Sequence, residues 1–248
     1  MSTTGLSFPG STGARLCGRL HRPDGQARGS ILLAHCFTCS KDMHTMTRLA
    51  RGLAAAGYAV LRFDFTGLGE SEGSFGAATV SHDVRDLVAA ATALIGEGYG
   101  PCGLLGHSLG GAASLLAAQR LKTVRSVAVL GAPASPGHVR HLLGEQPDGA
   151  CAIEVTIGGR TFTLARSFFD DLEQHDQRGA VASLQRPLLV LHAVADEVVS
   201  IEEGERNFAA AEQPKAFVPL LAADHLLTSR DAAEHALDFV RSWFDATL

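Results

Sequence analysis

The sequence predicts an α/β fold in which helices flank a mostly parallel central sheet. Short apolar runs typical of strands alternate with longer helical patterns along most of the 248 residues, and this alternation is typical of α/β domains. The expected strands are almost continuously apolar, which indicates a sheet that is covered on both faces. The length suits one large domain. We therefore expect residues 1–248 to form a single domain.

The apolar patterns assign the elements in order along the chain. The run "ARLCGRLHRP" (14–23) is expected to be an early antiparallel strand. The later apolar runs, each expected to be a strand, are 29–36, 58–65, 102–108, 125–133, 186–196 and 215–224. Helical spacing of apolar residues predicts helices over 43–57, 81–98, 109–121, 202–212 and 231–244. Gly57 supplies a stop signal for the first helix, and Ser81 an N-cap for the second.

The alternation of strands and helices breaks over residues 134–183. Within this segment, "CAIEVTIGGRTFTL" has two alternating runs around a Gly-Gly pair, which predicts a small hairpin. The stretch "ARSFFDDLEQHD" that follows predicts a short helix. We expect 134–183 to be an inserted cap over the carboxyl edge of the sheet, because that edge is where open α/β sheets bind ligands.

Composition and charge argue against several classes of partner. Apolar residues make up 46% of the chain and the net charge is −5 without a basic run, which argues against nucleic acid as a partner. No stretch has the eighteen or so apolar residues of a membrane helix, and the first residues lack the features of a signal peptide. The five cysteines, an odd number, fit a reducing compartment. We therefore expect a cytoplasmic protein without a membrane partner.

The motif "GHSLGG" indicates a nucleophilic serine. Gly106, Ser108 and Gly110 fit G-x-S-x-G, with an apolar strand directly before the motif and a helix of small residues directly after it. In this strand–turn–helix setting a strained turn holds the serine hydroxyl above the sheet, at the positive end of a helix. The alternative is a glycine-rich turn that contains an ordinary serine. We interpret Ser108 as a catalytic nucleophile.

A serine nucleophile needs a base, and the base needs an acid that orients it. Asp196 and His225 follow Ser108 in the chain order Ser, Asp, His, and each stands just after an expected strand. His225 would accept the Ser108 proton, and Asp196 would fix the tautomer of the imidazole. Glu197 and Asp224 compete for the role of the acid; Asp224 is interpreted as structural because it neighbours His225.

Four other polar residues receive structural interpretations. His107, beside the nucleophile, and His192, inside an expected strand, are expected to be buried histidines. Asp64 is expected to anchor the glycine-rich turn in "RFDFTGLGESEG" by hydrogen bonds. Glu70 could line the mouth of the cleft, but it is interpreted as a solvated acid of the same turn.

The stretch "HCFTCSKD" allows three interpretations. Cys36 and Cys39 could be a redox pair or half of a zinc site, or they could lie on the loop that completes an oxyanion hole. A redox motif would open a helix directly, whereas the next helix begins only near Met43, and no second pair with zinc spacing is apparent. We favour the oxyanion loop, with Phe37 and Leu109 as backbone N–H donors. We expect no metal or cofactor, and we expect that closing a Cys36–Cys39 disulfide would redirect the Phe37 peptide.

Six stretches resemble one superfamily across nearly the whole chain: "HCFTCSKD", "RFDFTGLGESEG", "GHSLGGAA", "GAPASPGHVRHL", "DEVVSIE" and "AADHLL". They resemble serine hydrolases of the α/β-hydrolase superfamily. More narrowly, they are similar to the hydrolase part of bacterial α/β-hydrolase/OsmC-like fusion proteins and to cinnamoyl and feruloyl esterases, which have Gly where Cys36 and Cys39 stand. The resemblance implies the α/β-hydrolase fold. The chain departs from the fusion proteins in having no OsmC-like part among its 248 residues, so we expect a stand-alone hydrolase. The catalytic set it implies is Ser108, Asp196 and His225 as triad and Phe37 and Leu109 as oxyanion donors.

These observations predict a serine carboxylesterase that hydrolyses small to medium acyl or aryl esters through an acyl-enzyme on Ser108. The alternatives are a thioesterase or amide hydrolase with the same triad, a non-catalytic ligand-binding protein on this fold, and a thiol-redox protein that uses Cys36 and Cys39. The expected partner is a small-molecule ester. The oligomeric state stays open, a homodimer being one option.

Overall fold

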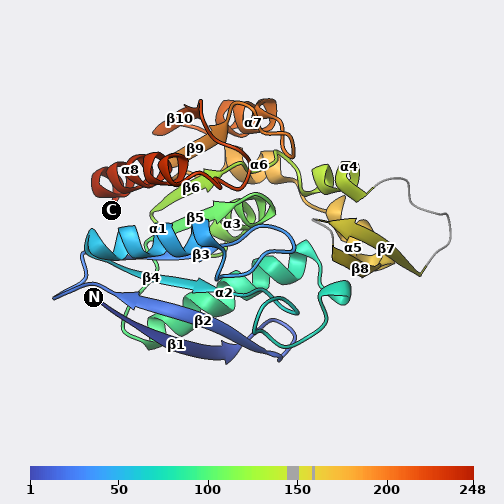
Figure 1. Ribbon diagram of the computed structural model, residues 1–248, viewed down its shortest axis with the longest axis horizontal. Helices are drawn as coiled ribbons and strands as arrows, with labels where there is room; N and C mark the ends of the chain where they lie inside the picture. The colour runs from blue at the N-terminus through green and yellow to red at the C-terminus, as the bar shows by residue number, and fades with distance from the viewer. Residues whose placement is uncertain (144–150, 158–159) are drawn as a thin grey trace.

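The computed structural model describes residues 1–143, 151–157 and 160–248. They form one eight-stranded sheet with helices packed on it (Figure 1). In spatial order its strands are β1 (Ser2–Pro9), β2 (Arg15–Arg22), β4 (Tyr58–Phe63), β3 (Gly29–Ala34), β5 (Gly103–His107), β6 (Ser126–Leu130), β9 (Leu188–Ala193) and β10 (Lys215–Leu220). The strands from β4 to β10 are parallel to one another, whereas β2 runs antiparallel to both β1 and β4. The predicted fold class is confirmed, and so is the early antiparallel strand.

The first strand, β1, is absent from the sequence-based assignment. It lies at the edge of the sheet, and only Phe8 among its residues is buried. An edge strand with so little apolar surface leaves almost no alternating pattern to detect.

Helices cover both faces of the sheet, as the continuous apolar strands require (Figure 1). The helices of one face are α1 (His44–Ala55) and α8 (Arg230–Thr247), and those of the other are α2 (Val80–Gly96), α3 (Leu109–Ala118), α6 (Gln177–Ala182) and α7 (Ile201–Ala210). Helix α8 illustrates why these helices pack on the sheet. Its buried residues Ala232, Ala236, Val240 and Phe244 recur every four positions and form one apolar stripe. Each face therefore encloses its own apolar cluster.

The segment between β6 and β9 lies beside the carboxyl edge of the sheet (Figure 1). Its elements are η2 (Pro136–His138), α4 (Val139–Leu143), β7 (Ala152–Ile157), β8 (Arg160–Ala165), α5 (Arg166–Leu172) and the helix α6 already given. Strands β7 and β8 pair antiparallel, so the predicted hairpin is confirmed, while its Gly-Gly turn at 158–159 lies outside the described residues. Leu164, Phe168 and Phe169 are buried in the same cluster as the sheet residues. That 134–183 is a separable cap stays a prediction.

Another short helix belongs to the loop after β4. This 3-10 helix, η1 (Phe75–Ala77), contacts β8 and α5 and so joins the β4 loop to the segment between β6 and β9. Among the described residues, no helix is both long and apolar enough to cross a membrane.

Candidate active site

Ser108 occupies a strained turn between β5 and α3. Its backbone angles are φ 55° and ψ −128°, a conformation that L-residues rarely adopt. The neighbouring glycines allow close approach: a Cβ at Gly106 would lie 2.5 Å from the Gly110 carbonyl oxygen, and a Cβ at Gly110 would clash with the His35 carbonyl oxygen. The turn thus presses the start of α3 against the loop that follows β3.

The structure brings Ser108, Asp196 and His225 together at the carboxyl edge of the sheet. His225 Nε2 lies 3.0 Å from Ser108 Oγ, and His225 Nδ1 lies 2.7 Å from Asp196 Oδ2. The Asp196 side chain is fully buried, whereas Ser108 and His225 each keep 8% of their surface exposed. The two competing acids lie elsewhere, since Glu197 is exposed and Asp224 accepts hydrogen bonds from Thr228.

The Asp196 carboxylate is stabilised in its charged form. Burial opposes the charge, but the hydrogen bond from His225 and those from the N–H groups of Val199 and Val198 outweigh it, so the pKa of Asp196 lies below its usual value. The two N–H groups lie 2.8 and 2.9 Å from Oδ1, which leaves Oδ2 to accept the His225 Nδ1–H. This arrangement holds His225 in the tautomer whose Nε2 can accept the Ser108 proton.

Two buried histidines hold the loops that carry the base and its acid. His107 Nε2 donates to the His225 carbonyl oxygen at 2.7 Å, and His192 Nε2 donates to the Val199 carbonyl oxygen at 2.8 Å. Burial, reinforced by the neighbouring His225, lowers the pKa of His107 to about 3, and burial also lowers the pKa of His192. Both histidines are buried, as predicted from the sequence, whereas the two hydrogen bonds were not predicted. The sequence signal that could have indicated these hydrogen bonds is that both histidines lie at or near the ends of strands that precede catalytic loops.

Phe37 and Leu109, the predicted oxyanion donors, line one small cavity with His35 and Gly110. The cavity measures about 10 Å³, roughly enough for one water molecule. In the part of the chain that the structure describes, the N–H groups of Phe37 and Leu109 have no hydrogen-bond acceptor. Unpaired backbone N–H groups are rare in proteins, so these two donors are available to an incoming acceptor such as an oxyanion. Ser108 itself does not line the cavity.

The far end of the Phe37 loop is held by a buried ion pair. Asp64 accepts hydrogen bonds from the Lys41 main-chain N at 2.6 Å, from Lys41 Nζ at 2.7 Å and from the Glu70 main-chain N at 2.9 Å. Lys41 is 1% exposed, and its Nζ also contacts the Glu70 carboxylate at 2.6 Å. The predicted role of Asp64 as a turn anchor therefore extends to the oxyanion loop. Glu70 is exposed, as predicted, and it is also an ion-pair partner of Lys41.

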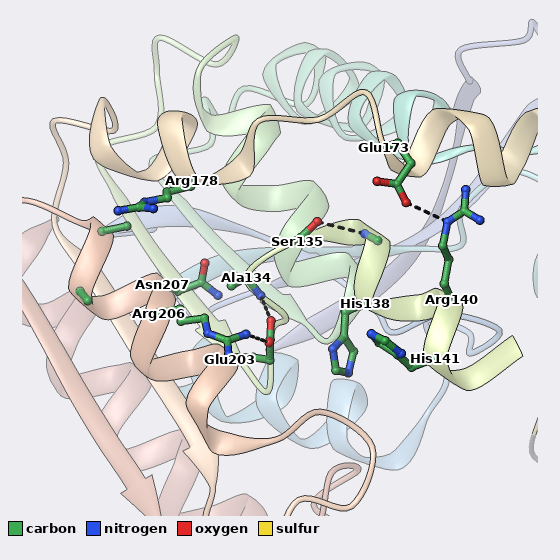
Figure 2. Close-up of a pocket in the computed structure, with 13 residues that line it drawn as sticks. Ala134, Ser135, His138, Arg140, His141, Glu173, Arg178, Glu203, Arg206 and Asn207 are labelled. Atoms are coloured by element: carbon green, nitrogen blue, oxygen red, sulfur yellow. Dashed lines mark hydrogen bonds and ion pairs between the residues drawn. The ribbon is translucent and has the colours of Figure 1, made fainter. Parts of the chain in front are cut away.

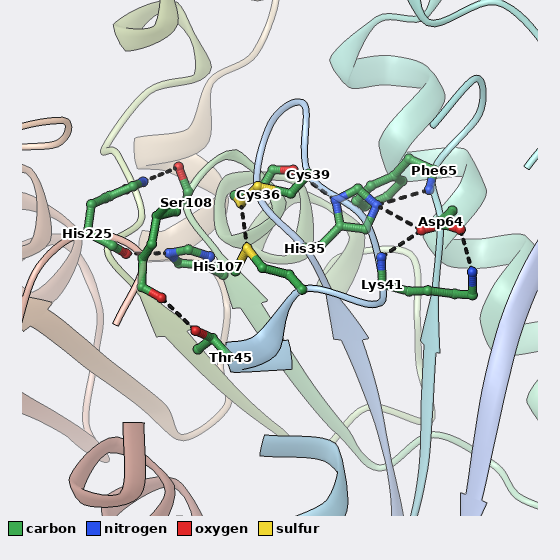
Figure 3. Close-up of a disulfide and its surroundings, with 12 residues drawn as sticks. His35, Cys36, Cys39, Lys41, Thr45, Asp64, Phe65, His107, Ser108 and His225 are labelled. Carbon is green, nitrogen blue, oxygen red and sulfur yellow. Dashed lines mark hydrogen bonds and ion pairs between the residues drawn. A yellow bond between two sulfur atoms is a disulfide. The ribbon is translucent and has the colours of Figure 1, made fainter. Parts of the chain in front are cut away.

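Cys36 and Cys39 form a disulfide within this loop, with their Cα atoms 5.4 Å apart (Figure 3). The Cys39 N–H donates to the Cys36 carbonyl oxygen at 3.2 Å, which closes a tight turn through Phe37 and Thr38. Thr38 has φ 61°, a left-handed conformation that costs about 1–2 kcal/mol for a residue with a Cβ. With this disulfide closed, Phe37 and Leu109 line the same cavity, and the expected redirection of the Phe37 peptide stays a prediction.

A larger cavity lies between α7, α6 and the η2–α4 stretch (Figure 2). It measures about 790 Å³, and neither Ser108 nor His225 lines it. Arg140 pairs with Glu173, and Arg206 pairs with Glu203, which also accepts the Ala134 N–H. Its charged groups are therefore largely paired with one another across the cavity wall.

A third hollow borders the catalytic base. This groove of about 650 Å³ is lined by His225 together with Val198, Leu221 and Leu226. Leu221 is 82% exposed, so the groove offers apolar surface next to the base. Among the described residues, no group of three or more His, Cys, Asp or Glu side chains is arranged to hold a metal ion.

The sheet order, the strained serine turn and the Ser108–His225–Asp196 contacts are those of an α/β-hydrolase. The family described as the Alpha/beta hydrolase family matches residues 31–247, and the chain belongs to this family. The resemblance found in the sequence is confirmed at this level, and the protein is an esterase-like enzyme of the α/β-hydrolase type.

Solved structures of esterases share the fold of this chain. It is 41% identical to the esterase domain of a Rhodothermus marinus protein, with a TM-score of 0.82 and 98% of each chain covered. Est1E from Butyrivibrio proteoclasticus, solved with ferulic acid bound, has 20% identity and a TM-score of 0.84 over 97% of this chain and 98% of that chain. An esterase from Pyrococcus furiosus has 16% identity and a TM-score of 0.77 over 99% and 93%. No curated protein sequence matches the chain.

Proposed function

We propose that the protein is a serine carboxylesterase that hydrolyses small to medium acyl or aryl esters through an acyl-enzyme on Ser108. The observation that carries this proposal is the continuous chain of contacts from Ser108 Oγ to His225 to the buried Asp196 carboxylate, at 3.0 and 2.7 Å. These distances are those of a hydroxyl activated by an oriented base.

The reaction follows from these contacts. As His225 Nε2 accepts the Ser108 proton, Oγ attacks the ester carbonyl carbon, and the oxygen that gains charge is stabilised by the N–H groups of Phe37 and Leu109. The C–O bond to the alcohol then breaks, and His225 gives its proton to the leaving oxygen. A water molecule repeats the sequence on the acyl-enzyme and releases the carboxylic acid. Asp196 stabilises the imidazolium in both halves.

One hollow is lined by the base His225 and another by the oxyanion donors Phe37 and Leu109, which supports separate places for the alcohol and the acyl group. The leaving oxygen must meet His225, so the alcohol belongs on the side of the 650 Å³ groove that His225 lines. The acyl group then points toward the cavity of about 10 Å³ behind Phe37 and Leu109. This favours short acyl chains and allows bulky or aromatic alcohols.

The test is turnover of p-nitrophenyl esters from acetate to octanoate, with the matching thioester and anilide measured beside them. A serine-directed phosphonate should label Ser108, as identified by mass spectrometry, and labelling should abolish turnover. Faster cleavage of the thioester or the anilide than of the ester would favour the alternative substrate classes. Ester turnover that survives in Ser108→Ala would overturn the proposal.

A further inference from the structure

The oxyanion loop is held firmly at its two ends and weakly in its middle. At its start, His35 Nδ1 donates to the Cys36 carbonyl oxygen at 2.8 Å, and the other ring nitrogen accepts the Phe65 N–H at 3.3 Å. At its end, Lys41 is bound to Asp64 through both its main chain and its side chain. Between these anchors, the only main-chain hydrogen bond within the described turn is the one from Cys39 to Cys36, at 3.2 Å.

The middle of the loop also adopts a conformation that its sequence disfavours. Thr38 has φ 61°, and a β-branched residue is a poor choice for this region, where glycine is the usual occupant. One long hydrogen bond is comparable in size to this conformational penalty, so it cannot fix the turn alone. The Cys36–Cys39 disulfide joins the two ends of the same turn (Figure 3).

We propose that the Cys36–Cys39 disulfide positions the oxyanion hole: it holds the Thr38 turn so that the Phe37 N–H faces the reacting oxygen, and its reduction lowers kcat. Cys36 and Cys39 are then positioning residues that act through Phe37. This inference rests on the proposed esterase function.

The contacts of the Phe37 ring indicate which kinetic constant will change. The ring lies 5.2 Å from the Phe75 ring and stacks at 5.4 Å on the Phe168 ring, measured between centroids. These contacts are independent of the disulfide and keep the side chain in place when the turn relaxes. The reduced enzyme should therefore keep its substrate contacts while its Phe37 peptide reorients, so that kcat falls and KM changes little.

The disulfide is accessible from one side. Cys36 is 3% exposed, whereas Cys39 is partly exposed and lines a groove of about 650 Å³ with Ser40 and Asp42. A dithiol reductant can attack Cys39 Sγ, so that the S–S bond breaks and Cys36 leaves as a thiolate that takes up a proton. The second thiol of the reductant then displaces Cys39. Two electrons and two protons pass to the protein, and the reductant ends as its own disulfide.

The first experiment compares oxidised and dithiothreitol-reduced protein, with the redox state verified by thiol mass labelling. Loss of one oxyanion donor costs about 10²–10³ in rate, so kcat should fall by up to that factor on reduction and recover on reoxidation. Cys36→Ser/Cys39→Ser should have the low kcat with and without reductant. The matched control is Cys151→Ser, which removes an exposed free cysteine and should respond to reductant as the wild type does. An unchanged kcat in verified fully reduced protein would overturn the inference.

A further substitution distinguishes positioning of the Phe37 N–H from general stabilisation of the fold. Thr38→Gly in the Cys36→Ser/Cys39→Ser background removes the conformational penalty, because glycine adopts positive φ readily. It should restore most of kcat without raising the melting temperature above that of the double serine variant. Failure of this rescue in a folded variant would count against the role assigned to the turn.

Hydrogen–deuterium exchange measures how firmly the oxyanion loop is held, and it needs no activity assay. Exchange in the peptide spanning 35–42 should speed up on reduction in the wild type, while peptides from β5 and β9 stay unchanged. If no ester is turned over in either redox state, the proposed function fails, and this exchange measurement still decides whether the disulfide holds the turn. Identical exchange in both states would refute that role.

Discussion

The carbonyl oxygen of His225 accepts a hydrogen bond from His107 Nε2, 2.7 Å away, so the residue before the nucleophile holds the main chain of the base (Figure 3). On the next residue, the Leu226 carbonyl oxygen accepts a hydrogen bond from Thr45 Oγ1 at 2.6 Å. Two successive carbonyls of this loop are therefore fixed by side chains from β5 and α1. The position of the imidazole follows from these main-chain anchors as well as from Asp196.

His107→Phe should lower kcat up to about tenfold with little change in KM. The ring is neutral because burial lowers the pKa of His107 to about 3, so it does not repel the imidazolium that forms on His225, whose ring centroid is 5.1 Å away. Phenylalanine keeps the packing but removes a hydrogen bond worth about 0.5–1.5 kcal/mol. Steady-state kinetics are the measurement, and His235→Phe on the exposed face of α8 is the control. A folded variant with wild-type kcat would show that His107 only fills space.

Ser108→Ala and His225→Ala should each abolish ester turnover while the protein stays folded. Both residues belong to one catalytic unit, in which a single loss removes most of the rate enhancement. Asp196→Asn should be milder but still severe, with kcat lower by about 10⁴ because the asparagine favours the wrong tautomer of the base. Kinetics with a p-nitrophenyl ester and circular dichroism check these expectations together. Near-wild-type turnover in either alanine variant would contradict the assigned roles.

The fold and the meeting of the three triad residues could be predicted because they depend on chain order. Ser108, Asp196 and His225 each follow a parallel strand, and the carboxyl ends of such strands meet at one edge of the sheet. Once the strands were assigned, the sequence alone was enough to place these residues near one another.

The supporting contacts could not be predicted because they depend on side-chain directions across distant segments. Nothing in the spacing of Lys41 and Asp64 reveals their buried ion pair, and nothing beside His107 points to a carbonyl 118 residues later. Likewise, the break in alternation revealed the segment 134–183 but not that Leu164 and Phe168 are buried in the main core. Deleting that segment would remove these two side chains from the core, and its separability stays a prediction.

Phe75→Ala should widen the acyl preference. Phe75 lines the small cavity behind Phe37 and Leu109, and its ring contacts that of Phe37. Removing the ring makes room for additional methylenes, each worth about 1–3 kcal/mol of discrimination in an apolar pocket. The ratio of kcat/KM for hexanoate over acetate esters should therefore rise about tenfold or more.

The control for the acyl pocket is Phe239→Ala, which truncates a phenylalanine that is 45% exposed on α8. It should leave the hexanoate-to-acetate ratio unchanged. If Phe75→Ala also leaves the ratio unchanged while the protein stays folded, the acyl group does not occupy this cavity.

The free energy of unfolding should decrease as the pH falls from about 6.5 to about 4, in part because of His21. This buried residue of β2 accepts a hydrogen bond from Arg62 Nε at 3.0 Å. Burial, then the charges of Arg62 and Arg51, lower its pKa to about 4 against the opposing effect of Asp42. In this window the unfolded chain binds a proton at His21 that the folded chain does not, so stability rises with pH, by up to about 3 kcal/mol for this one group. His21→Gln keeps an acceptor for Arg62 without titrating. Urea unfolding at pH 7, 6, 5 and 4 should give a smaller loss of stability for the variant than for the wild type, and equal losses would show that His21 does not couple folding to protonation.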